Sequence, residues 1–254
     1  VPQRPPGMIR AFVLALQLLT RLPIPSPAAP PRPADMGRAV LFFPVVGLLV
    51  GAILAGLPTV LGPVDPGVLA ALVLTVWILL TGGLHLDGLA DTADAWIGGQ
   101  GDRNRTLAIM KDPRSGPIAV VAVGLVLLNK FAALEVLLAG DGRLWLLLAP
   151  ALGRTCAVLL LLFTPYARPD GLGAPYARNL PRSSCGLVVL LVLAGTVAAL
   201  GWPGGFLLGV LGLGLIGLRH ALLRRLGGIT GDTLGAACEL AETVALLVPV
   251  LLAA

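Results

Sequence analysis

Long uncharged apolar runs constrain this chain more than any other feature of its sequence. Three such runs extend from Ala39 to Val64, from Pro66 to Leu84 and from Ser183 to Leu218. A helix needs about 20 mostly apolar residues to cross a lipid bilayer. Only 12% of the residues are charged, about half the usual share, so the chain cannot cover the surface of a soluble protein. The sequence therefore predicts an all-α polytopic membrane protein and excludes a soluble enzyme.

We expect about seven transmembrane helices. The run Ser183–Leu218 is long enough for two of them, and the turn-forming stretch Gly201–Gly205 divides it into a hairpin. The remaining expected spans are Pro117–Ala139 around Lys130, Leu144–Ala167 around Arg154, and Leu234–Ala254. The sequence shows no second domain, so residues 1–254 are predicted to form a single membrane domain.

The distribution of basic residues predicts the orientation of the chain. Fifteen of the 18 Lys and Arg residues fall in residues 1–38 and in the loops near 85–116, 168–182 and 219–231. These segments lie on one side of the membrane if successive spans cross it in opposite directions. Arg143 alone lies on the other side. Because positive charge gathers on the cytoplasmic side, we expect a cytoplasmic N-terminus and an external C-terminus.

The N-terminal segment, residues 1–38, is expected to lie at the cytoplasmic surface, ahead of the bundle formed by residues 39–254. Its apolar stretch Met8–Thr20 is too short to span and lacks the features of a signal peptide, which favours an interfacial or re-entrant helix. The three cysteines, Cys156, Cys185 and Cys238, are widely spaced. They are expected to be packing residues rather than a disulfide framework or a zinc site.

Acidic side chains are scarce, so their positions are informative. Seven of the 13 fall in three short stretches at the cytoplasmic ends of the expected spans. The first stretch places Asp87, Asp91 and Asp94 at i, i+4 and i+7, on one face of a helix and without a nearby cation. Three such carboxylates predict a site for a divalent cation, Mg²⁺ or Ca²⁺, and Mg²⁺ would typically be held there together with a substrate phosphate group; the alternative is an acidic solvated face. His85 is either a base or ligand, or a hydrogen-bonded structural residue.

The second stretch brings cations next to this predicted metal site. Lys111 and Arg114 flank Asp112, and Arg105 precedes them. Paired cations beside a metal are what a diphosphate requires. The alternative is that Asp112 closes a turn before Pro113 while the cations only set the topology.

The third stretch contains Asp232, Glu239 and Glu242, at the start of the last expected span. Asp232 fits an N-cap as well as a catalytic role. The two glutamates lie inside the span, where ionisable groups are costly and are read as functional by default. Lys130 and Arg154 lie at similar depth in other spans and are expected either to pair with these glutamates or to contact an anionic substrate.

The chain resembles the cobalamin synthase (adenosylcobinamide-GDP ribazoletransferase) family. The resemblance rests on three stretches. The first runs from Leu80 to Asp94 and contains the sequence TGGLHLDGLADTAD; the others are Met110-Lys111-Asp112 and Gly231–Ala237, which precedes the two glutamates. Further matches along the chain are Leu16–Pro25, Phe43–Gly47 and Lys130–Leu134. Two positions depart from the family pattern: Pro113 stands where Ser is expected, and Ala95-Trp96 replaces a smaller pair.

The resemblance implies a Mg²⁺-dependent transferase of cobalamin (vitamin B12) biosynthesis in the cell membrane. It would join adenosylcobinamide-GDP, a corrinoid, to α-ribazole or its 5′-phosphate and release GMP. In this reading Asp87, Asp91 and Asp94 hold the metal, and Asp94, Asp232 or His85 orients or deprotonates the attacking hydroxyl. The residues expected to bind substrate or phosphate are Arg105, Lys111, Asp112, Arg114, Lys130, Arg154, Glu239 and Glu242.

Two other functions compete with this interpretation. One is another membrane-embedded, Asp-rich Mg²⁺-diphosphate transferase, such as a CDP-alcohol phosphotransferase, whose motif spacing the chain does not meet. The other is a cation-coupled transporter, whose site should lie near the membrane midplane rather than at one face. The scarcity of aromatic residues outside the spans argues against nucleic acid as a partner. The expected partners are the two substrates and the lipid bilayer, and a homo-oligomer is left open.

Overall fold

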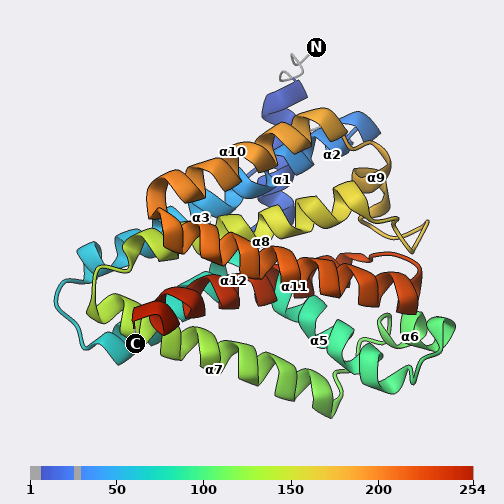
Figure 1. Ribbon diagram of the computed structural model, residues 1–254. Coiled ribbons are helices and arrows are strands. Elements are labelled where there is room, and N and C mark those ends of the chain that lie inside the picture. Colours follow the sequence, from blue (N-terminus) through green and yellow to red (C-terminus); the bar gives the residue numbers. More distant parts are fainter. Residues whose placement is uncertain (1–6, 26–29, 254) are drawn as a thin grey trace.

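The computed structural model describes residues 7–25 and 30–253, and this part of the chain is almost entirely helical (Figure 1). The helices are α1 (Gly7–Leu19), α2 (Pro33–Ala39), η1 (Val40–Phe42), α3 (Phe43–Leu61), α4 (Pro66–Thr81), α5 (Leu84–Gly98), α6 (Arg103–Ile109), α7 (Pro117–Ala139), α8 (Arg143–Phe163), α9 (Ala174–Arg178), α10 (Arg182–Leu200), α11 (Trp202–Leu226) and α12 (Gly231–Ala253). The prediction of an all-α fold is confirmed.

The number of spans also agrees with the sequence. Among the described residues, six helices are long and apolar enough to cross a membrane, and the bent pair α4–α5 would make seven. The predicted hairpin is present, because α10 ends at Leu200 and α11 begins at Trp202. The short apolar helix α1 has 13 residues, as expected of a segment that does not span. The proline-rich stretch after it falls partly on residues 26–29, outside the described residues.

The predicted span Pro66–Leu84 ends earlier than expected. Gly82 and Gly83 both adopt positive φ angles, 62° and 68°, and the chain turns there by 86° from α4 into α5. Glycine is the residue that enters this left-handed region without steric cost. A side chain at Gly82 would also collide with Arg21, whose backbone N–H donates to the Leu80 carbonyl. The turn places α5, with its row of aspartates, across the end of α4.

Helices α8 and α12 form the centre of the bundle. Helix α8 packs against α3 on one side and against α12 on the other, while α12 also contacts α5 and α7. Close approach of α3 to α8 depends on Gly47 and Gly51, where a Cβ atom would meet the α8 backbone around Leu147 and Ala151. The hairpin α10–α11 packs against α8 and leaves much of its apolar surface exposed, as expected of a surface that faces lipid.

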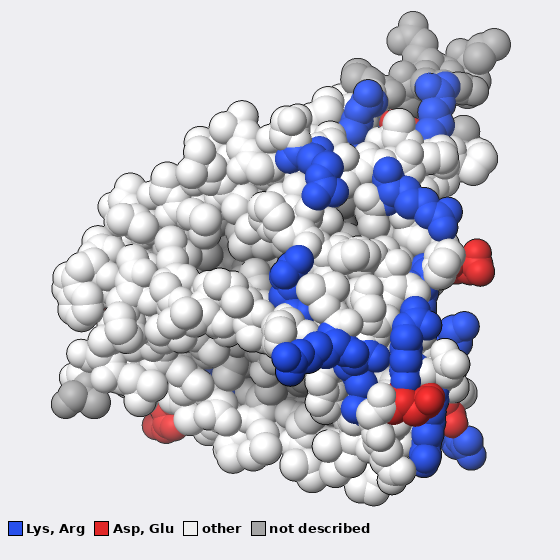
Figure 2. Space-filling model, turned by 45° about the vertical axis from the view of Figure 1, so that its right-hand side comes forward, with Lys and Arg blue, Asp and Glu red and all other residues white. Residues whose placement is uncertain are grey.

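Basic side chains gather toward one end of the molecule. Figure 2 shows Lys and Arg on the right-hand part of the face in view and none on its left-hand part. Several of them also stabilise helix ends: Arg219 donates to the Phe163 carbonyl at 2.9 and 3.1 Å, and Arg182 donates to the Leu162 carbonyl, both at the C-terminus of α8. The orientation of this end relative to the cytoplasm stays a prediction.

Candidate active site

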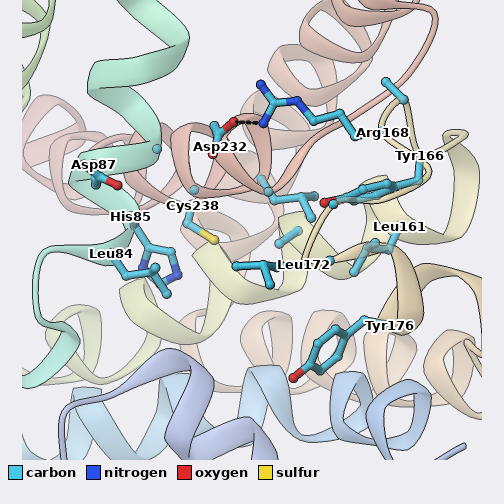
Figure 3. Close-up of a pocket in the computed structure, with 18 of the residues that line it drawn as sticks. Leu84, His85, Asp87, Leu161, Tyr166, Arg168, Leu172, Tyr176, Asp232 and Cys238 are labelled. Atoms are coloured by element: carbon cyan, nitrogen blue, oxygen red, sulfur yellow. Dashed lines mark hydrogen bonds and ion pairs between the residues drawn. The ribbon is translucent and has the colours of Figure 1, made fainter. Parts of the chain in front are cut away.

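A cavity of about 1040 Å³ opens between α5, α6, α8, α9 and α12. One part of its lining is charged and includes Asp87, Asp232, Arg168 and Lys111. Another part is apolar and includes Phe43, Leu161 and Tyr176. Figure 3 shows Leu84, His85 and Asp87 on one side, Tyr166 and Tyr176 on another, and the ion pair between Asp232 and Arg168 above them. The cavity can therefore hold a ligand that is ionic at one end and apolar at the other.

Two of the predicted acidic stretches meet at this cavity because α5 and α12 pack closely. A Cβ atom added to Gly88 would meet the backbone of Asp232, 2.7 Å from its carbonyl oxygen. A Cβ atom added to Gly235 would lie 3.2 Å from the Cα atom of His85. The two glycines thus let the helices approach until Asp87 and Asp232 line one cavity. The expected convergence of the first and third stretches is present.

Of the two roles considered for Asp232, that of N-cap of the last helix is wrong. Thr230 and Thr233 cap this helix reciprocally: the Thr230 N–H donates to Thr233 Oγ1 at 2.8 Å, and the Thr233 N–H donates to Thr230 Oγ1 at 3.2 Å. Asp232 Oδ2 instead accepts from Arg168 Nη1 at 2.9 Å. Because the threonines satisfy the helix end, the Asp232 carboxylate is available to the cavity.

The loop after α8 carries Arg168 into the site. Its start is held by a short parallel bridge between Tyr166 and Ile229, with the Ala167 N–H donating to the Ile229 carbonyl at 2.7 Å. Arg168 also donates to the Leu107 carbonyl at 3.2 Å, which ties the loop to α6. The loop, α6 and the start of α12 therefore form one hydrogen-bonded wall of the cavity.

The three aspartates of α5 have different surroundings. Asp87 lines the cavity, and Asp91 lies within electrostatic reach of Asp87, Asp232 and Arg168. Asp94 caps α7: it accepts hydrogen bonds from the backbone N–H groups of Gly116 and of Ala119, the latter at 2.8 Å. The structure thus explains Asp94 by a capping role, and its roles as metal ligand or base stay predictions.

No group of three or more His, Cys, Asp or Glu side chains in the described part of the chain is arranged to hold a metal ion. This does not conflict with Mg²⁺, which is usually held by one or two carboxylates together with substrate phosphates and water. Asp87, Asp91 and Asp232 provide hard oxygen donors, and the positive charge of Arg168 acts on Asp91 from nearby. The donor set therefore fits a Mg²⁺ ion that arrives with a phosphate-bearing substrate.

The predicted phosphate-binding cations are only partly at the cavity. Lys111 lines it, whereas Arg105 contacts the Gln100 side chain at 3.4 Å and is exposed. Arg114 pairs with Asp112 at 2.7 Å on the surface, and this pair holds the pKa of the Asp112 carboxyl down at about 2. Asp112 and Arg114 thus satisfy each other, and their contact with substrate stays a prediction.

The ionisable residues inside the spans pair with one another, which was one of the two alternatives. Lys130 Nζ lies 2.7 Å from Glu239 Oε2 and 2.5 Å from Glu242 Oε2. Arg154 Nη1 pairs with Glu242 Oε1, and Arg154 Nη2 lies 3.2 Å from His85 Nδ1. All five residues are at most 5% exposed. Of this set only His85 and Arg154 line the cavity.

Several cavity residues were not predicted as site residues. Arg103 and Arg168 were counted only as charges that set the topology, and Tyr166 and Tyr176 received no role. A usable signal was present for Arg168, since it lies in a Gly- and Pro-rich loop between two spans, on the side that also carries the acids. Its contact with Asp232, 64 residues away in sequence, could not be read from local spacing.

Comparison with known proteins agrees with this geometry. The family model described as Cobalamin-5-phosphate synthase matches residues 11–250. The chain is 52% identical over 241 residues to the adenosylcobinamide-GDP ribazoletransferase of Pseudomonas syringae pv. syringae (strain B728a), covering 95% of this chain and 99% of that protein.

Two further relatives have the same name. The chain is 52% identical over 236 residues to that of Stutzerimonas stutzeri (strain A1501), covering 93% of this chain and 96% of the relative. It is 52% identical over 237 residues to that of Ectopseudomonas mendocina (strain ymp), covering 92% and 96%. No solved structure matches the chain. The chain therefore belongs to the cobalamin-5-phosphate synthase family, multi-pass membrane transferases of cobalamin biosynthesis.

Proposed function

We propose that the chain joins adenosylcobinamide-GDP to α-ribazole or α-ribazole 5′-phosphate and releases GMP, with Mg²⁺ as its cofactor. We place the reaction at the cytoplasmic face of the cell membrane, where the basic end of the bundle would lie. One observation carries the proposal: acidic side chains from two distant stretches and several cations, Lys111 and Arg168 among them, line one large cavity that also has an apolar lining.

The two parts of the cavity suit the two chemical parts of the substrates. The diphosphate would lie at the charged end, where Lys111 and Arg168 provide positive charge. The aromatic base of the ribazole would lie against Phe43, Leu161 and Tyr176. The bulky corrinoid would remain at the mouth, with only its nucleotide-bearing arm inside.

A Mg²⁺ ion at this end would be held by Asp87 and Asp91, with Asp232 next to them. When bound, it would neutralise charge on the diphosphate and on the departing GMP. Lys111 and Arg168 would orient the phosphate oxygens, which keeps the phosphorus in line with the attacking hydroxyl. The apolar lining would keep bulk water from competing as the nucleophile.

The chemical step exchanges the phosphoanhydride bond of the diphosphate for a new phosphate ester bond, which gives a phosphodiester. The ribazole hydroxyl oxygen forms a bond to the phosphorus attached to cobinamide, the bond from that phosphorus to the bridging oxygen breaks, and GMP leaves with the electron pair. The hydroxyl proton must be accepted. Asp232 is best placed to accept it at Oδ1, because Arg168 and Thr230 occupy Oδ2 while Asp94 is engaged as the cap of α7.

The test is product formation by the purified protein in detergent. Adenosylcobinamide-GDP and α-ribazole phosphate are supplied with Mg²⁺, with chelator, or with either substrate omitted, and both GMP and the corrinoid product are measured. Asp87→Asn and Asp232→Asn should abolish Mg²⁺-dependent turnover. Asp65→Asn is the matched control, because Asp65 caps α4 through the Gly67 and Val68 N–H groups and Asn caps as well. Folded wild-type protein that makes no product under any of these conditions would refute the proposal.

A further inference from the structure

Five buried polar side chains form a continuous chain of contacts through the centre of the bundle. They come from four helices: His85 from α5, Lys130 from α7, Arg154 from α8, and Glu239 and Glu242 from α12. Lys130 bridges the two glutamates, Glu242 binds Arg154, and Arg154 reaches His85. With two cations and two carboxylates the cluster is balanced in charge, as a group inside a membrane span must be.

The contact between Arg154 and His85 determines where the imidazole proton lies. A guanidinium group stays protonated in proteins and can only donate hydrogen bonds. His85 Nδ1, 3.2 Å from Arg154 Nη2, must therefore be the acceptor. An imidazole whose Nδ1 accepts carries its proton on Nε2. The network thus selects one tautomer of His85.

The second nitrogen of His85 is directed to the cavity. His85 lines the cavity, on the helix that carries Asp87 (Figure 3). Among the residues that the structure describes, Nε2 has no hydrogen-bond partner, and it is not among the fully buried polar atoms without one. A donor without a protein partner at the charged end of a binding cavity is available to an acceptor on the ligand.

We propose that His85 donates a hydrogen bond from Nε2–H to a phosphate oxygen of the substrate, and that Arg154, Glu242 and Lys130 are positioning residues that hold it as a donor. The inference rests on the proposed function for the identity of the substrate, and it assigns His85 a role other than that of base. Arg154 acts through His85: its guanidinium is held by Glu242, which Lys130 holds in turn.

Two substitutions separate the two nitrogens of the ring. In His85→Asn, the amide oxygen can take the place of Nδ1 and accept from Arg154, but the side chain is too short to donate into the cavity. In His85→Gln, the amide nitrogen can reach the place of Nε2 and donate, although the group cannot act as a base. Folding of each variant is checked by size-exclusion chromatography and circular dichroism. Gly56→Ala is the neutral control, since no atom of the described part of the chain lies within 4 Å of a Cβ atom there.

Two readouts are measured for each folded variant: turnover, and the dissociation constant of inorganic pyrophosphate by calorimetry. We expect His85→Asn to raise the dissociation constant of pyrophosphate by about tenfold or more, because losing a hydrogen bond to a charged group weakens binding by about that factor. We expect His85→Gln to stay within about threefold of wild type in binding and to retain turnover.

Two outcomes overturn the proposal. If His85→Asn binds pyrophosphate and turns over like wild type, His85 is only a structural partner of Arg154. If both variants bind like wild type but neither turns over, His85 acts as a base. Wild-type protein that makes no cobalamin product refutes the proposed reaction. The pyrophosphate measurement still decides whether His85 donates a hydrogen bond to phosphate.

Discussion

Removal of Lys130 should destabilise the protein more than any substitution at its surface. Lys130 Nζ contacts two buried carboxylates, at 2.7 and 2.5 Å, and lies 4.5 Å from the centre of the Trp77 ring. Its side chain is 3% exposed. Lys130→Met keeps an unbranched apolar side chain of similar length, so the change chiefly removes the charge. Among the described residues, Glu239 then has no ion-pair partner left, and Glu242 keeps only Arg154.

The expected magnitude follows from the burial of this cluster. Deleting one partner of a buried ion pair costs about 3–5 kcal/mol, because the remaining charge stays out of water. That is a large part of a typical unfolding free energy of about 5–15 kcal/mol. Neutralising the orphaned carboxylate should reverse much of the loss. We expect the double variant Lys130→Met/Glu239→Gln to regain about 2 kcal/mol relative to Lys130→Met alone.

The measurement is the free energy of unfolding in mixed micelles, followed by circular dichroism as sodium dodecyl sulfate is added. Lys111→Met is the matched control, because Lys111 is exposed and the same substitution there should change stability by less than about 0.5 kcal/mol. The reasoning is refuted if Lys130→Met unfolds within about 1 kcal/mol of wild type, or if the double variant is no more stable than the single one.

Three further predictions follow from the contacts around the cavity. Asp94→Ala should cost about 1–2 kcal/mol of unfolding free energy because α7 loses its cap, whereas Asp94→Asn should retain most of it; equal losses would contradict the capping role. Gly88→Val should abolish turnover by pushing α5 away from the Asp232 backbone, while Gly56→Val, with open space around it, should not. Arg168→Gln should change stability by at most about 1 kcal/mol, since its ion pair is partly exposed, but should lower turnover by about tenfold or more. If Arg168→Gln lowers the free energy of unfolding by as much as it raises the activation free energy of turnover, Arg168 has no specific role in phosphate binding.

The membrane spans could be predicted almost completely from the sequence. The run that ends at Ala139 and the break after Leu200 coincide with helix ends in the structure. The prediction succeeded because a bilayer demands a minimum apolar length, which is a local property of the sequence. It was less accurate at the end of α4, where the double glycine turns the chain by 86° before the apolar run is finished.

The candidate site could be predicted only in part. Asp87 and Asp232 were selected from scarcity and spacing, and both line the cavity. Asp94 belongs to the same row of aspartates, but it accepts a hydrogen bond from the backbone of α7, which follows α6 in the chain. Arg168 was not predicted, because its partner is far away in sequence and its charge has another explanation in topology.

The sequence by itself determined which segments enter the membrane and in which stretches the few acidic groups lie, because both depend on composition within one turn or one span of helix. Only the tertiary structure decided what each ionisable group does. In the row of carboxylates on α5, Asp87 lines the cavity whereas Asp94 caps α7. The buried glutamates of α12 pair with Lys130 and Arg154 from two other helices. Charge–charge and hydrogen-bond energies depend on distances between helices, and these distances arise from packing rather than from spacing along the chain.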